Sequence, residues 1–444
     1  MRFPKVFVAA TALTALALGG CSTNTAELDA EAEVDGLRVA VVDNPDIEQM
    51  KDLVDHFTED TGVNVSFDVL GEGELRQKVT TDIATGAGRY DVVMVGPYET
   101  PIWAERGWLT PLGADADSGL IPSVAGALSV DDELYALPFY GEAAFTMYRS
   151  DLFEEAGLTM PDQPTWQDLL DFAAELDDPQ AGVYGACMRG EPGWGENVVL
   201  VTAMVNAFGG RWFDEDWVPQ LDTEPWHEAL TAYADLAKFA DPDIPNMGYN
   251  ENLEKFRDGG CAIWMDSTAA AAHVTEEGSA VEGDVAFAPA PTAGGKISSN
   301  WLWTWALAVP TATKNEADAK AFVEWATSPE YEALVAETHG WLSVPPGTRT
   351  ELYENPEYLE AAPFAPLVYE ALLAADPLSP TEEPVPYTGI QYVMIPEFQG
   401  IGTAVGNQIA EVIRGEISVD EALENSQWVT ETVSERIRFT EEEE

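Results

Sequence analysis

The chain has 444 residues, enough for two or three domains of ordinary size, and its 46% of hydrophobic residues is typical of a folded protein. Lysine and arginine number 21 against 79 aspartates and glutamates, which gives a formal net charge of −58. A protein with so few basic residues lacks the positive surface that binds phosphate backbones or anionic lipid, so nucleic-acid binding and electrostatic attraction to membranes are excluded.

The first twenty residues have the features of a signal peptide. Two basic residues precede an apolar run over residues 6–18, which is too short to cross a bilayer comfortably. The run ends in Leu-Gly-Gly-Cys, a pattern that resembles the bacterial lipobox, whose cysteine becomes the lipidated N-terminus. We therefore predict a signal peptide over 1–20, lipidation of Cys21 and a flexible tether over 21–36. The alternative is an ordinary signal peptide with an incidental cysteine.

From residue 37 onward, strand patterns alternate with helix patterns. Short β-branched or apolar runs predict the strands, and apolar residues at helical spacing predict the helices. We expect strands at 37–42, 63–70, 90–95, 134–139, 144–148, 261–265 and 306–309, a helix opening at Pro45, and helices at 75–84, 166–176, 197–208, 225–239, 317–327 and 329–337. This alternation is typical of an α/β protein with a mostly parallel sheet, in which ligands bind at the carboxyl ends of the strands.

Cys187 and Cys261 are the cysteines that remain after Cys21. In an exported chain two such residues predict one disulfide, with a pair of buried thiols as the alternative. The bond would brace the neighbourhood of Arg189 and Asp266, which follow the two cysteines closely in sequence.

No enzyme signature was found in the sequence. G-x-S-x-G, P-loop and paired-histidine patterns are absent. The glycine-rich run at 400–406 has its third glycine one position late for a dinucleotide loop, so we expect it to open a helix that ends at Ile413. We predict no metal site and no cofactor. With 79 acidic residues, a carboxylate pair for glycoside hydrolysis is not recognisable by counting, so an extracellular glycosidase stays an alternative.

Six segments, in order along the chain, resemble the solute-binding lipoproteins of ABC sugar importers, and more narrowly the branch that binds sorbitol and mannitol. They are RQKVTTDI at 76–83, LPFYGE at 137–142, RGEPGWGEN at 189–197, NWLWTWALAVP at 300–310, VPPGTRT at 344–350 and IPEFQG at 395–400. The resemblance runs from about residue 37 to residue 425. The chain departs from the family in its acidity and in Glu191, where the family pattern favours a basic residue.

The resemblance implies an α/β fold of the type II periplasmic-binding-protein kind, with two lobes joined by hinge strands and the ligand between them. We expect lobe 1 to combine 37–138 with 288–328, lobe 2 to combine 139–287 with 329–438, and residues 439–444 to be a disordered tail.

The function that the resemblance implies is capture rather than catalysis. A lipid-anchored monomer on the outer face of the cell membrane would bind a sugar alcohol, close around it and deliver it to the permease subunits of an ABC transporter. A mono- or oligosaccharide is the alternative solute.

The predicted ligand site collects polar and aromatic side chains at strand ends and turns. Charged groups would hold hydroxyls, because charged hydrogen bonds are roughly twice as strong as neutral ones, and aromatic faces would cover C–H surface. We expect Asp266 to accept from two hydroxyls and Arg189 and Arg349 to donate. The full set is Asn44, Tyr98, Glu99, Tyr140, Glu142, Arg189, Trp194, Glu196, Asp266, Trp301, Trp303 and Arg349. Packing or solvated roles are the alternative for each of them.

The acidic excess has two interpretations. It can keep a solvated surface soluble by self-repulsion, or it can mark a protein adapted to high salt, where screening removes the cost of that repulsion. Since 8 of the 21 basic residues are lysine, we favour adaptation to salt.

Overall fold

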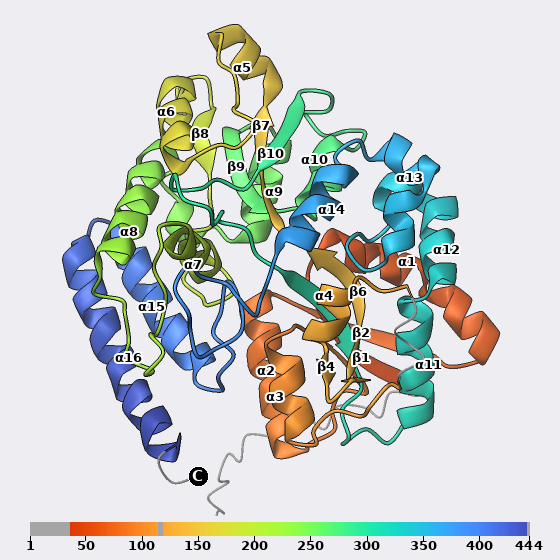
Figure 1. The fold of residues 1–444 in the computed structure, drawn as a ribbon. Helices are drawn as coiled ribbons and strands as arrows, with labels where there is room; N and C mark the ends of the chain where they lie inside the picture. Colours follow the sequence, from red (N-terminus) through yellow and green to blue (C-terminus); the bar gives the residue numbers. More distant parts are fainter. Residues whose placement is uncertain (1–35, 114–118, 442–444) are drawn as a thin grey trace, which may run out of the picture. The chain divides into compact units, whose positions relative to one another are not determined.

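Two β-sheets form the framework of the chain in Figure 1, a computed structural model that describes residues 36–113 and 119–441. The expected signal peptide, Cys21 and all but the last residue of the expected tether lie outside these residues. The larger sheet has the order β2-β1-β3-β11-β6, and the smaller sheet has the order β10-β7-β9-β8. The strands are β1 (Leu37–Val42), β2 (Val65–Leu70), β3 (Val92–Val95), β6 (Ala136–Glu142) and β11 (Trp303–Ala308), then β7 (Ala144–Arg149), β8 (Tyr184–Cys187), β9 (Cys261–Ser267) and β10 (Val285–Pro289). A separate ribbon pairs β4 (Ser129–Val130) with β5 (Glu133–Leu134).

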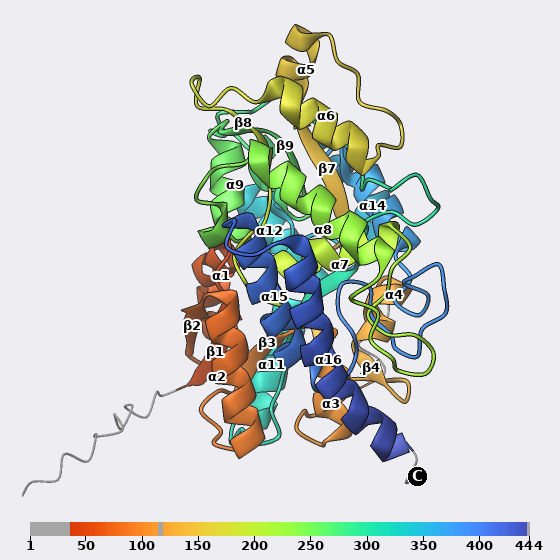
Figure 2. The same ribbon diagram turned by 90° about the vertical axis from the view of Figure 1, so that its left-hand side faces the viewer.

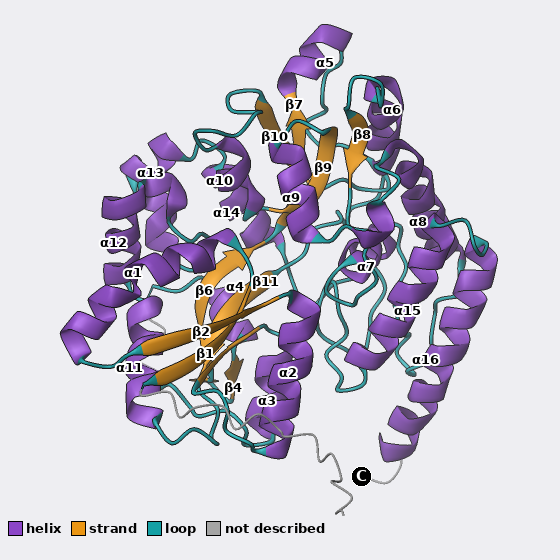
Figure 3. Cartoon of the chain, turned by 180° about the vertical axis from the view of Figure 1, so that it is seen from behind, coloured by secondary structure: helices purple, strands orange, loops and turns teal. Residues whose placement is uncertain are grey.

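Helices pack around both sheets, as Figure 3 shows from behind. They are α1 (Pro45–Thr61), α2 (Glu72–Thr85), α3 (Glu99–Glu105), α4 (Pro122–Ala127), α5 (Ser150–Ala156), α6 (Trp166–Leu176), α7 (Asn197–Ala207), α8 (Glu224–Leu236), α9 (Tyr249–Arg257), α10 (Ala270–Thr275), α11 (Glu316–Ala326), α12 (Pro329–His339), α13 (Pro356–Ala361), α14 (Ala365–Ala374), α15 (Phe398–Ile413) and α16 (Val419–Glu441). Figure 2 shows α15 and α16 side by side next to α8. None of the helices in the described ranges is long and apolar enough to cross a membrane.

Local sequence signals explain several of these elements. The hydroxyl of Thr165 accepts from the backbone N–H of Asp168, whose carboxylate accepts in return from the N–H of Thr165, so α6 begins at a reciprocal capping box. At α1 the cap is not reciprocal, since the side-chain oxygen of Asn44 accepts from the backbone N–H of Ile47. Strand β3 is apolar and buried along its whole length, which is typical of a central strand covered on both faces.

The expectation of a mostly parallel arrangement is wrong. Strand β1 pairs in parallel with β2 and β3, and β8 with β9, but β11 is antiparallel to β3 and β6, and β7 is antiparallel to β9 and β10. The reason is that β6 passes into β7 through Ala143 alone and thereby changes sheets. Two antiparallel strands can be neighbours in a sheet without a crossover helix between them. The strands that connect the two sheets can therefore join either sheet in the antiparallel direction.

The strands divide by sheet along the chain. All strands of the larger sheet lie before Ala143 or in β11, and the smaller sheet is built from residues between 144 and 289. After β11, α12 packs by Tyr331 against Trp325 of α11, with ring centroids 5.1 Å apart. The lobe limits expected from the sequence stay a prediction. The disordered tail expected over 439–444 also stays a prediction, and α16 extends to Glu441.

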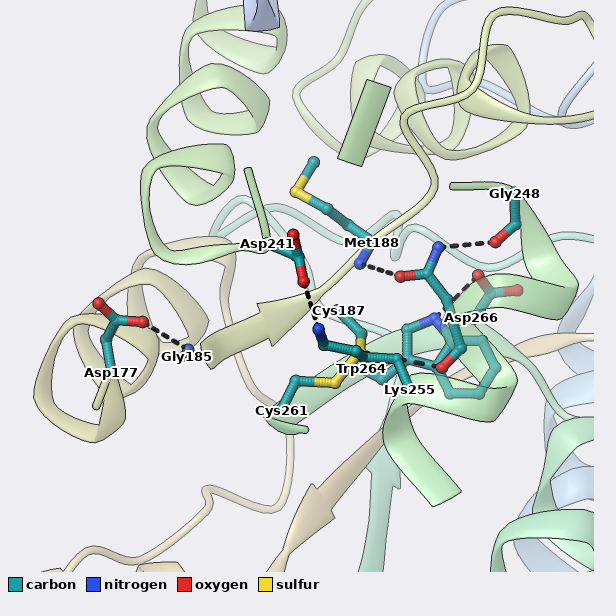
Figure 4. The surroundings of a disulfide bond; sticks show 11 residues. Asp177, Gly185, Cys187, Met188, Asp241, Gly248, Lys255, Cys261, Trp264 and Asp266 are labelled. Atoms are coloured by element: carbon teal, nitrogen blue, oxygen red, sulfur yellow. Dashed lines mark hydrogen bonds and ion pairs between the residues drawn. A yellow bond between two sulfur atoms is a disulfide. The ribbon is translucent and has the colours of Figure 1, made fainter. Parts of the chain in front are cut away.

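A disulfide joins Cys187 and Cys261, as the sequence predicts, with 5.7 Å between their Cα atoms (Figure 4). It ties the end of β8 to the start of β9, which are parallel neighbours in the smaller sheet. Two residues beyond Cys187 lies Arg189, and β9 carries Asp266 near its other end. The bond therefore fixes the pair of strands that presents these two side chains.

Candidate ligand site

A cavity of about 680 Å³ lies where residues from both sheets converge, within the usual size range of small-molecule sites. The larger sheet contributes the end of β1 and residues of β6 and β11, together with the first turns of α2. The loop 189–196, which follows β8 of the smaller sheet, supplies the opposing wall. Of the predicted site residues, those that line the cavity are Asn44, Tyr140, Glu142, Arg189, Trp194, Glu196, Trp301 and Trp303.

Four predicted residues, Tyr98, Glu99, Asp266 and Arg349, are not part of the lining. Arg349 lies elsewhere, where its guanidinium donates to the carbonyl of Thr327 at 3.1 Å and approaches Glu332 at 3.8 Å. The other three stand directly behind lining residues and hold them in place.

Asp266 is the partner of Arg189. Its Oδ1 accepts from Nη2 of Arg189 at 2.7 Å, and its Oδ2 from Nε at 3.0 Å. The remaining lone pairs accept from the indole of Trp264 at 3.1 Å (Figure 4) and from the backbone N–H of Ser267 at 2.7 Å. With 1% of its surface exposed, Asp266 does not offer a free carboxylate to two hydroxyls, in contrast to the expectation from the sequence.

Arg189 is therefore a charged donor aimed by a buried carboxylate. Its Nη1 donates to the carbonyl of Gly195 at 3.0 Å and lies 3.6 Å from Glu196. Burial opposes the charge on this guanidinium, but the attraction of Asp266 and Glu196 outweighs it and raises the pKa of Arg189 well above its usual value. The side chain stays cationic in the cavity wall.

A second buried cation, Arg76, also lines the cavity, and the predicted site omitted it. Its guanidinium donates to Glu72 at 2.8 Å and also to Glu99, whose other oxygen accepts from the N–H of Gly96 at 3.1 Å. Burial alone would lower the pKa of Arg76, but Glu99 and Glu72 raise it. Arg76 stands in the first matched segment and four residues after Glu72, a spacing at which helical side chains meet, so a signal was present in the sequence.

Tryptophan rings surround the guanidinium of Arg76. Its central carbon lies 3.9 Å from the ring centroid of Trp194, 5.0 Å from that of Trp303 and 5.1 Å from that of Trp305. Such cation–π contacts orient the rings as well as the cation. The ring of Tyr98 packs against that of Trp194, with 4.9 Å between the ring centroids. The hydroxyl of Tyr98 donates to the carbonyl of Ile395.

Three glutamates in the lining, Glu142, Glu191 and Glu196, have raised pKa values, in each case chiefly through burial. Burial raises the pKa of Glu142 to about 7, against the opposing attraction of Arg189 and a hydrogen bond of 2.6 Å from the Ser267 hydroxyl. Burial likewise raises the pKa of Glu196. A carboxyl that is protonated for part of the time near neutral pH can both donate to and accept from a hydroxyl.

Three buried polar atoms in the cavity wall have no hydrogen-bond partner within the described part of the chain. They are the indole nitrogens of Trp194 and Trp301 and the amide oxygen of Gln391. Their side chains are 4%, 1% and 1% exposed. An unpaired buried polar group is costly, so atoms of this kind in a cavity wall indicate where a ligand forms hydrogen bonds. No group of three or more potential metal ligands occurs among the residues that the structure describes.

A cavity that is lined by residues from both sheets, with charged pairs, tryptophan faces and unpaired polar atoms, is typical of a protein that binds a small polar solute. Residues 44–333 match the bacterial extracellular solute-binding protein family, and the chain belongs to this family.

Its similarity to individual members is high. The chain is 46% identical to the mannitol-binding protein of Pseudomonas aeruginosa over 89% of this chain and 92% of that protein. The chain is also similar to an ABC transporter solute-binding protein from Agrobacterium vitis, whose crystal structure contains bound D-mannitol. The two sequences are 48% identical and the TM-score is 0.88, with 90% of this chain and 99% of that chain covered. The chain shares its fold with maltose-bound T. maritima MalE3. The identity is 20% and the TM-score is 0.78, with 90% of this chain and 99% of that chain covered. The fold class predicted from the sequence is confirmed.

Proposed function

We propose that the chain captures a linear sugar alcohol, with D-mannitol as the first candidate, as the binding component of an ABC importer. The observation that carries the proposal is the mixture of unpaired groups in the cavity wall, which has two N–H donors on Trp194 and Trp301 and one acceptor on Gln391. A hydroxyl both donates and accepts, so a solute made of neighbouring hydroxyls can satisfy all three. The similarity to a mannitol-binding protein and to a solute-binding protein with bound D-mannitol supports the choice of solute.

The charges in the wall favour the same class of solute. Glu72, Glu142 and Glu196 line the cavity, and an anionic solute would meet their repulsion. Carboxylates neutralise the two arginines in the wall, since Arg189 pairs with Asp266 and Arg76 with Glu72. The arginines can therefore donate to hydroxyls, and the site does not require a negatively charged ligand. The rings of Trp194, Trp301 and Trp303 supply apolar faces for the C–H groups of the solute.

Closure around the solute would use contacts between the two walls. Arg76 of α2 stacks on Trp194, and the amide of Asn250 donates to the carbonyl of Asp43 at 3.0 Å. Glu72 approaches Gly195 so closely that a side chain at position 195 would overlap its carboxylate. A solute that touches both walls binds the closed state better than the open one and shifts the population toward it.

We also propose that lipidated Cys21 tethers the protein, as a monomer, to the outer face of the cell membrane, where it delivers solute to permease subunits. The support is the Leu-Gly-Gly-Cys run behind a short apolar segment and the extracellular character of the family. Replacement of Cys21 by alanine should release the protein into the medium, and a variant that stays in the membrane fraction to the wild-type extent would contradict the tether.

A thermal-shift screen tests the solute class. The mature chain would be heated with mannitol, sorbitol, arabitol, xylitol, glucose, maltose and trehalose, because a ligand that binds only the native state raises the melting temperature. We expect the hexitols to give the largest shifts. A shift with maltose or trehalose and none with any polyol would refute the proposal in favour of a disaccharide.

A further inference from the structure

We propose that Gln391 is a specificity-determining residue, whose amide oxygen accepts a hydrogen bond from one particular hydroxyl of the solute. The inference rests on the proposed function and goes beyond it, because it assigns the selection among hydroxylated solutes to one side chain. Gln391 lies in the segment between α14 and α15, outside the segments from which the predicted site was drawn.

The side-chain amide of Gln391 has a fixed orientation. Its Nε2 donates to the carbonyl of Leu302 at 2.9 Å, in the stretch that also carries Trp301 and Trp303. Because the nitrogen is held by that carbonyl, the oxygen must point away from it, and this oxygen is buried without a partner in a residue that lines the cavity. An amide oxygen can only accept, so it is satisfied by a solute group that donates.

The backbone around Gln391 is also fixed. Asn206, a buried residue of α7, donates its amide hydrogen to the carbonyl of Ile390 at 2.7 Å. Gly389 has a φ of 105°, and a side chain there would overlap the carbonyl of Tyr392, so the turn requires glycine. The N–H of Gly389 donates to the carbonyl of Pro377 at 2.8 Å. A rigid support of this kind holds an acceptor in place before the ligand arrives, which favours selectivity.

A fixed single acceptor discriminates more sharply than the titratable groups that also line the cavity. Arg189 and Glu142 present several donor or acceptor positions and can serve hydroxyls at different places along a flexible polyol. The amide oxygen of Gln391 accepts along a limited range of directions, and a solute without a hydroxyl at that place leaves it buried and unpaired. Loss of that hydrogen bond should weaken binding about 10- to 100-fold.

The test is a coupling experiment between the side chain and the solute. Calorimetry would compare D-mannitol with its symmetric dideoxy analogues, each of which lacks both members of one pair of equivalent hydroxyls, on the wild type and on Gln391→Met. In the wild type we expect one analogue to bind about 10- to 100-fold more weakly than mannitol. In Gln391→Met that difference should vanish, while the differences shown by the other analogues remain. A purely structural role of Gln391 would weaken all solutes alike and leave every difference unchanged.

Gln49→Met is the matched control. Gln49, on α1, also has a buried amide oxygen without a partner, but it does not line the cavity. Its variant should bind mannitol and each analogue as the wild type does. If Gln391→Met fails to fold in a melting experiment, Gln391→Asn serves instead, because it keeps the amide but withdraws the oxygen by one methylene.

The outcomes separate the two proposals. If the wild type binds no hexitol, the proposed function is wrong and the role of Gln391 falls with it. If the wild type binds mannitol but the Gln391 variant keeps every wild-type difference between mannitol and its analogues, the proposed function stands and the role of Gln391 is wrong. Loss of one difference only, with the control unchanged, supports both.

Discussion

Replacement of Asp266 by asparagine should weaken both the fold and solute binding. The substitution keeps the shape but removes the charge that pairs with Arg189 through contacts of 2.7 and 3.0 Å, at a carboxylate that is 1% exposed. Removing one partner of a buried ion pair leaves the other charge uncompensated and costs about 3–5 kcal/mol. For a chain of this size we expect the melting temperature to fall by roughly 5 °C or more.

The effect on binding follows from the loss of orientation of Arg189. The guanidinium would keep its bond to Gly195 but lose the carboxylate that fixes its plane, so the affinity for mannitol should fall at least about tenfold. Calorimetry for binding and thermal unfolding for stability measure the two effects separately.

Asp68→Asn is the matched control for this prediction. Asp68 pairs with Arg38 at 2.8 Å, away from the cavity, and the two side chains are 25% and 20% exposed. A pair that is more accessible to solvent should contribute only about 1 kcal/mol or less, and its loss should leave binding unchanged. If Asp266→Asn melts and binds like the wild type, or if the two variants behave alike, the role assigned to the buried pair is wrong.

Three further predictions concern protonation, stacking and salt. The pKa of Glu142 is raised to about 7, above the ordinary value of 4.5, so its contribution to stability is full below about pH 4.5 and is lost as the pH rises through 7. Glu142→Gln should flatten the pH dependence of the free energy of unfolding in that window. An unchanged slope would contradict the raised pKa. Arg76→Lys keeps the charge but loses the planar stacking on Trp194, so calorimetry should show mannitol affinity about tenfold lower, whereas wild-type affinity would show that the stacking is unimportant. With a net charge of −58, the protein should be more stable in molar salt than in 10 mM salt, since the Debye length falls from about 30 Å to about 3 Å; unfolding curves that do not move with salt would refute this.

The sequence predicts elements well where local chemistry decides them. Helix α6 has the predicted limits because its cap and its apolar spacing are both local signals. Strand direction was mispredicted because β6, β7 and β11 connect or complete sheets through tertiary contacts that no window of sequence contains. Helix α16 was not predicted, and the acidic residues at its C-terminal end have the composition of a solvated tail.

The candidate site was predicted in part because the matched segments contain most of its lining residues. For Asp266 the sequence predicts a ligand contact because an acid ends the strand, and only the fold brings Arg189, 77 residues away in sequence, against it. Gln391 carries no signal at all. A single glutamine in an irregular segment has no periodicity, and its importance arises only from the bond to Leu302 and the cavity beside it.

Direct titration of the mature chain with D-mannitol, followed by maltose, tests the central claim. We expect saturable binding of mannitol, one molecule per chain, and no heat of binding for maltose at the same concentrations. Binding of maltose with no binding of mannitol would contradict it.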